Sequence, residues 1–449
     1  MNIRRNVTWN VVEVVLMMMT QFAIFRIIIE NLGVSALGIW SLVFSTLSFV
    51  GIANVGVAGT LTRFIAKPPA EDDIYIPPLR YVETAFSTNL LLYSALVLIG
   101  FTPAFFALSW ASHGVDLEMA RHLLPYAMIS FVVLNVSNIS ASALIGFKRS
   151  DIKSALSILA LGVQLGISVL TIRRFGIVGL ALAQIAQNLV AGILGWLQIL
   201  RISRSGTYLK FPFRFNTAAF KEMIGFGIRL QALNVTSYLY DPATKFVLSA
   251  IAGPMALGMY EVAYRLVFQT RALIVAPAQN LPPMFAAIPS GNIANRRVLY
   301  QTSTALMLSV SVLGSIAVVL ISPLVSLVLL GEVRWPYVEW VSILSAGWLV
   351  NVAAVPAYLM GVGCGWVRWN IVGMALSILV SCVCGYILGT QIGAVGVVIA
   401  AALGIGGGAI VVMVANCRIG QVGSPFPPLI AFRGLISELR NRALRATAQ

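Results

Sequence analysis

Charged side chains are scarce in this sequence of 449 residues. Asp, Glu, Lys and Arg together make up 10% of it, whereas soluble domains carry roughly 25%. Hydrophobic residues make up 59%, and many apolar runs exceed the roughly 18 residues that mark a membrane helix. The composition therefore excludes a soluble globular protein and predicts a multi-pass integral membrane protein without an independent soluble domain.

The residue patterns of several enzyme classes are also missing. No GxxxxGK[ST] loop occurs, so ATP hydrolysis is not expected. The four cysteines form no CxxC pair and are interpreted as packing residues, and the two histidines alone give weak support for a metal site. Because neither paired carboxylates nor a histidine-rich cluster is present, we expect no catalytic site, no metal and no cofactor.

The positive charge is large but is explained by membrane topology. A net charge of +15 would suit a nucleic-acid-binding protein. However, most Lys and Arg fall on one side of the expected membrane helices, which is typical of cytoplasmic loops. We therefore expect contact with anionic lipid headgroups, no nucleic-acid partner, and both termini in the cytoplasm.

Two sequence matches predict an internal repeat. Asn31–Trp40 resembles Ile251–Tyr260 at an offset of 220 residues, and Phe175–Leu182 resembles Ile392–Ile399 at an offset of 217. Apolar segments of about 20 residues predict about twelve transmembrane helices. Six helices per repeat make the repeats parallel. The predicted fold is an all-α membrane protein with two parallel, pseudo-symmetric six-helix lobes around a central cleft.

Composition shifts give the expected domain boundaries. The longest basic connection contains no acid and is the natural linker between the lobes. The apolar residues of the C-terminal tail fall at helical spacing among arginines, which predicts a basic amphipathic helix on the inner leaflet. The predicted parts are the N-terminal lobe 1–205, the cytoplasmic linker 206–220, the C-terminal lobe 221–420 and the cytoplasmic tail 421–449.

Proline, glycine and small polar residues predict local features of the helices. Pro103 should kink or end its helix, and Pro242 should kink or break the helix that contains it. Glycines at 404 and 406–408 should allow close helix packing. The helix at 122–146 is unusually polar, and its polar residues either hold helices together or form a sugar-facing wall. They are Asn135, Ser137, Asn138, Ser140 and Ser142.

Charges inside the expected membrane helices are the strongest functional signal. An ionisable side chain at bilayer depth is costly and normally faces a bundle interior or a wet cavity. Cations outnumber acids there, which predicts a cavity that binds an anion. The predicted site residues are Arg26, Arg229, Lys245, Arg265 and Arg271.

Three acids accompany these cations. Glu30 follows Arg26, Asp241 precedes Lys245 and Glu261 precedes Arg265, each at the i, i+4 spacing that allows pairing on one helix face. These pairs are either purely structural, or the acids Glu30, Asp241 and Glu261 take part in ion coupling. Coupling to a Na⁺ or H⁺ gradient stays open.

At this point the chain resembles a known family. The LGxxxLGIW turn, Gly51–Lys67 (GIANVGVAGTLTRFIAK) and Gly253–Val267 (GPMALGMYEVAYRLV) are similar to the polysaccharide flippase branch of the multidrug/oligosaccharidyl-lipid/polysaccharide (MOP) exporter superfamily, over about residues 5–420. Asn54 departs from the acid that relatives often carry there, which puts ion coupling in question. The chain stops at about twelve helices, so we do not expect the lipid II flippase branch.

The resemblance implies a MATE-like fold and a function. It implies a flippase that moves an undecaprenyl-diphosphate-linked, O-antigen-type oligosaccharide from the cytoplasmic to the outer leaflet of the bacterial inner membrane by alternating access of the lobes. Membrane lipids and other polysaccharide assembly proteins are the implied partners. The first alternative is a multidrug or cation antiporter, which would favour an acidic cavity. The second is a membrane glycosyl or phosphoglycosyl transferase, which would need a catalytic acid cluster.

Overall fold

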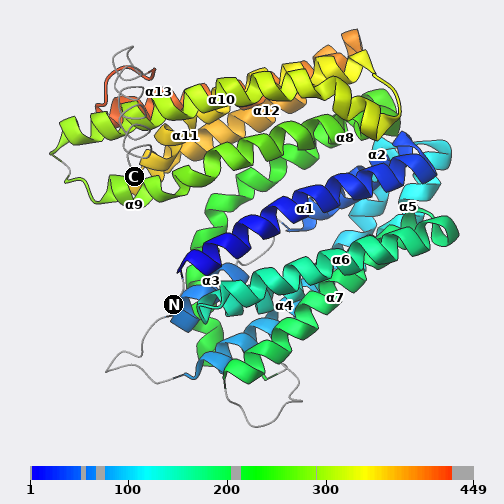
Figure 1. Cartoon of the computed structure of the whole chain (residues 1–449), viewed down its shortest axis with the longest axis horizontal. Helices are drawn as coiled ribbons and strands as arrows, with labels where there is room; N and C mark the ends of the chain where they lie inside the picture. Colours follow the sequence, from blue (N-terminus) through cyan, green and yellow to red (C-terminus); the bar gives the residue numbers. More distant parts are fainter. Residues whose placement is uncertain (1–2, 52–56, 67–75, 204–213, 290, 427–449) are drawn as a thin grey trace, which may run out of the picture. The chain divides into compact units, whose positions relative to one another are not determined.

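The chain folds into long α-helices. The computed structural model describes residues 3–51, 57–66, 76–203, 214–289 and 291–426 (Figure 1). Ten helices in this part are long and apolar enough to cross a membrane. Long apolar helices satisfy their own backbone hydrogen bonds, which lipid requires. The predicted class of an all-α, multi-pass membrane protein is confirmed, whereas the total of twelve spanning helices stays a prediction.

The chain divides into two compact units, residues 1–242 and 243–449, and each is described by itself. The predicted linker lies largely outside the described residues, as does the predicted amphipathic tail beyond residue 426. The helices of the first unit are α1 (Ile3–Leu32), α2 (Val34–Gly51), α3 (Val57–Ala66), α4 (Pro78–Ala111), α5 (Gly114–Gly146), α6 (Ser150–Phe175), α7 (Ile177–Ile202) and the start of α8 (Thr217–Val275).

The second unit contains the rest of α8 and the helices after it. Its core is built by α9, α10, α11 and α13, and α12 packs along α13. These elements are the 3₁₀ turn η1 (Ala276–Asn280), α9 (Leu281–Ala286), α10 (Ile293–Leu330), α11 (Trp335–Gly363), α12 (Arg368–Ile392) and α13 (Ala394–Gly420).

Neither Pro103 nor Pro242 ends its helix, whereas a kink at either proline stays a prediction. Helix α4 continues through Pro103 to Ala111, and α8 continues through Pro242. The break in α8 lies instead at Gly253, where φ is 77° and ψ is 175°. Membrane helices tolerate proline because neighbouring groups can satisfy the freed carbonyl. The left-handed region, by contrast, strongly favours glycine.

The backbone confirms the repeat at both matched turns. Gly33 and Gly253 share positive φ values of 88° and 77°, and Gly176 and Gly393 share values of 56° and 68°. A third turn joins α5 to α6. There the N–H of Arg149 donates to the Leu144 carbonyl, and 217 residues later Trp366 donates to Gly361 in the same way. The offset of 217 therefore holds from the end of α5 through the start of α7.

Small residues set the distance between packed helices, as predicted. Ser140 Oγ donates to the Gly192 carbonyl at 3.0 Å, so α5 and α7 are held together by a polar contact. A Cβ added to Gly408 would overlap Ser377 Oγ and the Gly373 carbonyl of α12. A Cβ on Gly407 would meet nothing within 4 Å. Close packing is thus confirmed for Gly408 and does not involve Gly407.

This difference between adjacent glycines predicts a stability test. Gly408→Val should strongly reduce folded protein, because the backbone of α12 cannot move aside as a flexible side chain could and overpacking costs about 1–3 kcal/mol or more. Gly407→Val is the matched control and should fold normally. Size-exclusion chromatography in detergent measures both. Equal yields of monodisperse protein from the two variants would contradict the packing described here.

Candidate functional site

Three predicted residues of the second unit form one buried charge cluster. The side chains of Lys245 and Glu261 are 3% and 4% exposed, and their charged atoms Nζ and Oε2 lie 2.7 Å apart. Arg265 donates to the other carboxylate oxygen through two nitrogens, at 2.9 and 3.2 Å. One carboxylate therefore contacts two cations, and the formal charges of these three side chains sum to +1.

The local structure explains this arrangement. Glu261 and Arg265 lie one turn apart on the same stretch of α8, and the predicted contact between them is present. Lys245 precedes the break at Gly253, so the turn there brings it back onto Glu261. Lys245 Nζ also lies 5.7 Å from the centre of the Tyr264 ring, a distance at which the ring face attracts a cation.

Arg271 lies further along α8 in neutral surroundings. Its Nε donates to Asn351 Oδ1 at 3.0 Å, and its guanidinium carbon lies 4.9 Å from the centre of the Trp348 ring. It lines a small cavity of about 10 Å³ together with Ser311 and Ser345, roughly enough for one water molecule. Neither contact neutralises its charge, so Arg271 adds a second positive centre to the same unit.

Arg26 and Glu30 of the first unit are less buried than the cluster on α8. Arg26 Nε lies 3.3 Å from Glu30 Oε2, and their side chains are 41% and 61% exposed within the described chain. The predicted pair is thus present. Asp241 lies in α8 just before the unit boundary. The side chain of Arg229 falls among residues 226–238, which lie outside the described side chains.

The exposed pair predicts a test of whether Arg26 is structural. The protein buries neither side chain of this pair, so Arg26→Ala should leave the melting temperature of the detergent-solubilised protein near that of the wild type. The double reversal Arg26→Glu/Glu30→Arg keeps the pair and moves the cation. If the doubly reversed protein transports at the full wild-type rate, Arg26 acts as a structural partner of Glu30 and is not part of the predicted anion site.

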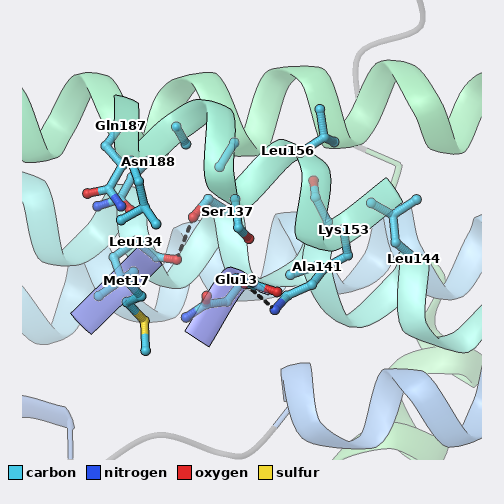
Figure 2. A pocket seen from close by; sticks show the side chains of 16 residues that line it. Glu13, Met17, Leu134, Ser137, Ala141, Leu144, Lys153, Leu156, Gln187 and Asn188 are labelled. Carbon is cyan, nitrogen blue, oxygen red and sulfur yellow. Dashed lines mark hydrogen bonds and ion pairs between the residues drawn. The ribbon is translucent and has the colours of Figure 1, made fainter. Parts of the chain in front are cut away.

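The first unit also contains a polar pocket that the charge pattern did not predict (Figure 2). It has a volume of about 240 Å³ and lies among α1, α5, α6 and α7. Lys153 Nζ contacts Glu13 Oε1 across it at 2.6 Å. The two residues are 140 positions apart, and Lys153 lies in the first turn of α6. Only the unusual polarity of the helix at 122–146 pointed toward this region.

Comparison with solved structures identifies the fold. An inward-facing multidrug resistance MATE family transporter of the MOP superfamily is 16% identical, with a TM-score of 0.72 over 90% of this chain and 94% of that chain. Lipid II flippase MurJ, in an inward closed conformation, is 13% identical, with a TM-score of 0.69 over 94% and 89%. A MOP superfamily transporter from Pyrococcus furiosus Vc1 is 15% identical, with a TM-score of 0.60 over 94% and 96%.

These similarities define the protein class as a multi-pass membrane protein with the MATE-like fold of MOP superfamily transporters. A comparison with curated proteins finds no match. The model of the family described as polysaccharide biosynthesis protein matches residues 3–288, more than half of the chain. The chain belongs to that family, and the resemblance stated from the sequence is confirmed.

Proposed function

We propose that this protein is a flippase that moves a polyprenyl-diphosphate-linked oligosaccharide, with undecaprenyl as the carrier, across the bacterial inner membrane. The observation that carries the proposal is the excess of cations on α8. Five Lys and Arg residues stand against three acids along Thr217–Val275. Lys245 and Arg265 both contact Glu261, and Arg271 contacts neutral groups. A site of this charge suits an anionic headgroup.

These cations suit the main energetic cost of moving such a lipid across the membrane. A diphosphate loses its hydration when it enters a low-dielectric region, and charge-assisted hydrogen bonds from Arg and Lys offset that loss. Arginine adds two parallel donors that fit phosphate oxygens. In this proposal the headgroup enters from the cytoplasmic leaflet, both termini face the cytoplasm, and alternating access of the two lobes releases the lipid outside.

The family match supports this substrate class. The matching model is that of polysaccharide biosynthesis proteins, and one of the similar folds belongs to a flippase of lipid II. The multidrug exporter remains the second candidate because another similar fold is a multidrug resistance transporter. A cationic drug would be disfavoured beside Arg271, whose guanidinium contacts the neutral Asn351 and Trp348, so the glycan lipid is the better fit.

Depleting the protein in its host tests the proposal. Lipid-linked glycan should accumulate on the cytoplasmic leaflet, where a membrane-impermeant oxidant added to intact spheroplasts cannot modify it. Wild-type protein supplied in trans should restore access of the oxidant to the glycan. If depletion leaves the amount and sidedness of every lipid-linked glycan unchanged but sensitises cells to cationic drugs, the multidrug function replaces this one.

A further inference from the structure

The polar pocket of the first unit contains its own neutralising charges. Glu13 and Lys153 pair at 2.6 Å, with side chains 12% and 26% exposed. The hydroxyl-bearing Ser157 lines the pocket beside this pair. Because the one carboxylate and the one ammonium of the pocket neutralise each other, its lining offers no net charge. The pocket therefore favours a neutral polar ligand over an ion.

Several amide and hydroxyl groups converge on the same space. Figure 2 shows Gln187 and Asn188 at one end of the pocket and the Glu13–Lys153 pair toward the other. Asn188 is 6% exposed, and its Nδ2 donor is buried with no hydrogen-bond partner. A buried donor without a partner costs about 1–3 kcal/mol, so this amide points to a bound group that accepts a hydrogen bond.

The second unit of the repeat carries few of these polar residues at the matching positions. When the offset of 217 is continued along the helices on either side, six polar lining positions correspond to small or apolar residues of the second unit, while Lys153 corresponds to Asn370. The second unit packs with the same helix order and the same turns. The six pairs are Ser137 with Ala354, Asn138 with Val355, Ser140 with Ala357, Ser157 with Met374, Gln187 with Gly404 and Asn188 with Ile405.

The dimensions and the apolar wall narrow the ligand class. The volume of about 240 Å³ lies below the roughly 300–1,000 Å³ typical of pockets for drug-sized ligands. Aliphatic side chains, including Leu134, Leu156 and Leu161, complete the lining. A single pyranose ring has matching features. One of its faces is rich in C–H groups, and its rim carries hydroxyls that both donate and accept hydrogen bonds.

We propose that this pocket binds one neutral sugar residue of the transported glycan. The inference rests on the proposed function, and it adds a glycan subsite inside the first unit to the diphosphate site on α8. The start of α1, the end of α5 and the start of α6 meet near the Glu13–Lys153 pair. Under the proposed topology this is the cytoplasmic side, from which the sugar headgroup arrives.

Binding is tested on the full-length protein in detergent by saturation-transfer NMR. The probes are methyl glycosides of neutral hexoses and N-acetylhexosamines, with methyl glucuronide as the anionic comparison. At least one neutral glycoside should receive saturation. Asn138→Ala and Gln187→Ala should weaken that signal roughly two- to tenfold, the effect of losing one hydrogen bond. Asn135→Ala is the matched control, because Asn135 Nδ2 donates to Phe131 of its own helix at 2.9 Å outside the pocket lining.

Three outcomes would overturn the subsite. The first is that no neutral glycoside receives saturation, and the second is that all variants give equal signals. The third is that sodium chloride shifts the melting temperature, Glu13→Gln abolishes this shift, and no glycoside gives a saturation-transfer signal. Reconstituted vesicles then separate the two proposals. Asn138→Ala should slow flipping of the glycan-bearing lipid while leaving the bare polyprenyl diphosphate unaffected. If the wild type flips neither lipid, the proposed function fails. The glycoside-binding experiment then still shows whether the pocket binds a neutral sugar.

Discussion

Replacing Lys245 with methionine should lower the free energy of unfolding by about 3 kcal/mol. Removing one partner of a buried ion pair costs roughly 3–5 kcal/mol because the other charge stays buried. The lower value applies here since Arg265 still contacts Glu261 at 2.9 Å. The stability of the purified variant in detergent, followed by thermal unfolding against the wild type, measures the effect.

A double variant distinguishes this cause from a general packing defect. Lys245→Met/Glu261→Gln removes both buried charges at similar volume, which is often neutral or stabilising. It should therefore unfold at a higher temperature than the single variant. The side chain of Arg265 is 29% exposed and is thus less buried than either replaced side chain. A double variant no more stable than Lys245→Met would show that the ion pair is not what stabilises this part of α8.

The cluster also shows what sequence spacing can and cannot predict. The contact between Glu261 and Arg265 follows from four-residue spacing on one helix and was predicted. The contact between Lys245 and Glu261 depends on how α8 turns at Gly253, and spacing along one helix does not reveal it. The pair of Asp241 with Lys245 stays a prediction. The glycine that sets this turn was visible in the repeat, but its backbone angles were not.

The fold was more predictable than the polar pocket for a related reason. Lipid imposes long apolar helices, and the two glycine turns repeat in the sequence, so class and repeat follow from local patterns. The pocket joins Glu13 to Lys153 across 140 residues. Each residue alone resembles an ordinary charge near a helix end. Only the packing of α1 against α6 brings them together.

Arg271→Ala should reduce flipping of the lipid-linked glycan at least tenfold. The guanidinium contacts Asn351 and the Trp348 ring, both of them neutral, so its charge is available to an anionic headgroup. A hydrogen bond to a charged group contributes about 1.5–3 kcal/mol, and each 1.4 kcal/mol corresponds to tenfold in affinity. Arg271→Lys should keep part of the activity, because lysine retains the charge but lacks the paired donors. Vesicle assays with the glycan-bearing lipid measure the rate.

Two controls separate the charge of Arg271 from its role in packing. Asn351→Ala removes the hydrogen-bond partner of Arg271 but keeps the cation, so most transport should remain. Arg334→Ala removes an arginine of the same unit whose charge is already paired with Glu332 at 2.9 Å, outside the candidate site. It should transport like the wild type. If Arg271→Ala also flips the lipid at the wild-type rate and equal protein level, Arg271 does not bind the diphosphate. If Arg265→Ala behaves the same way, the cations of α8 are not the substrate site.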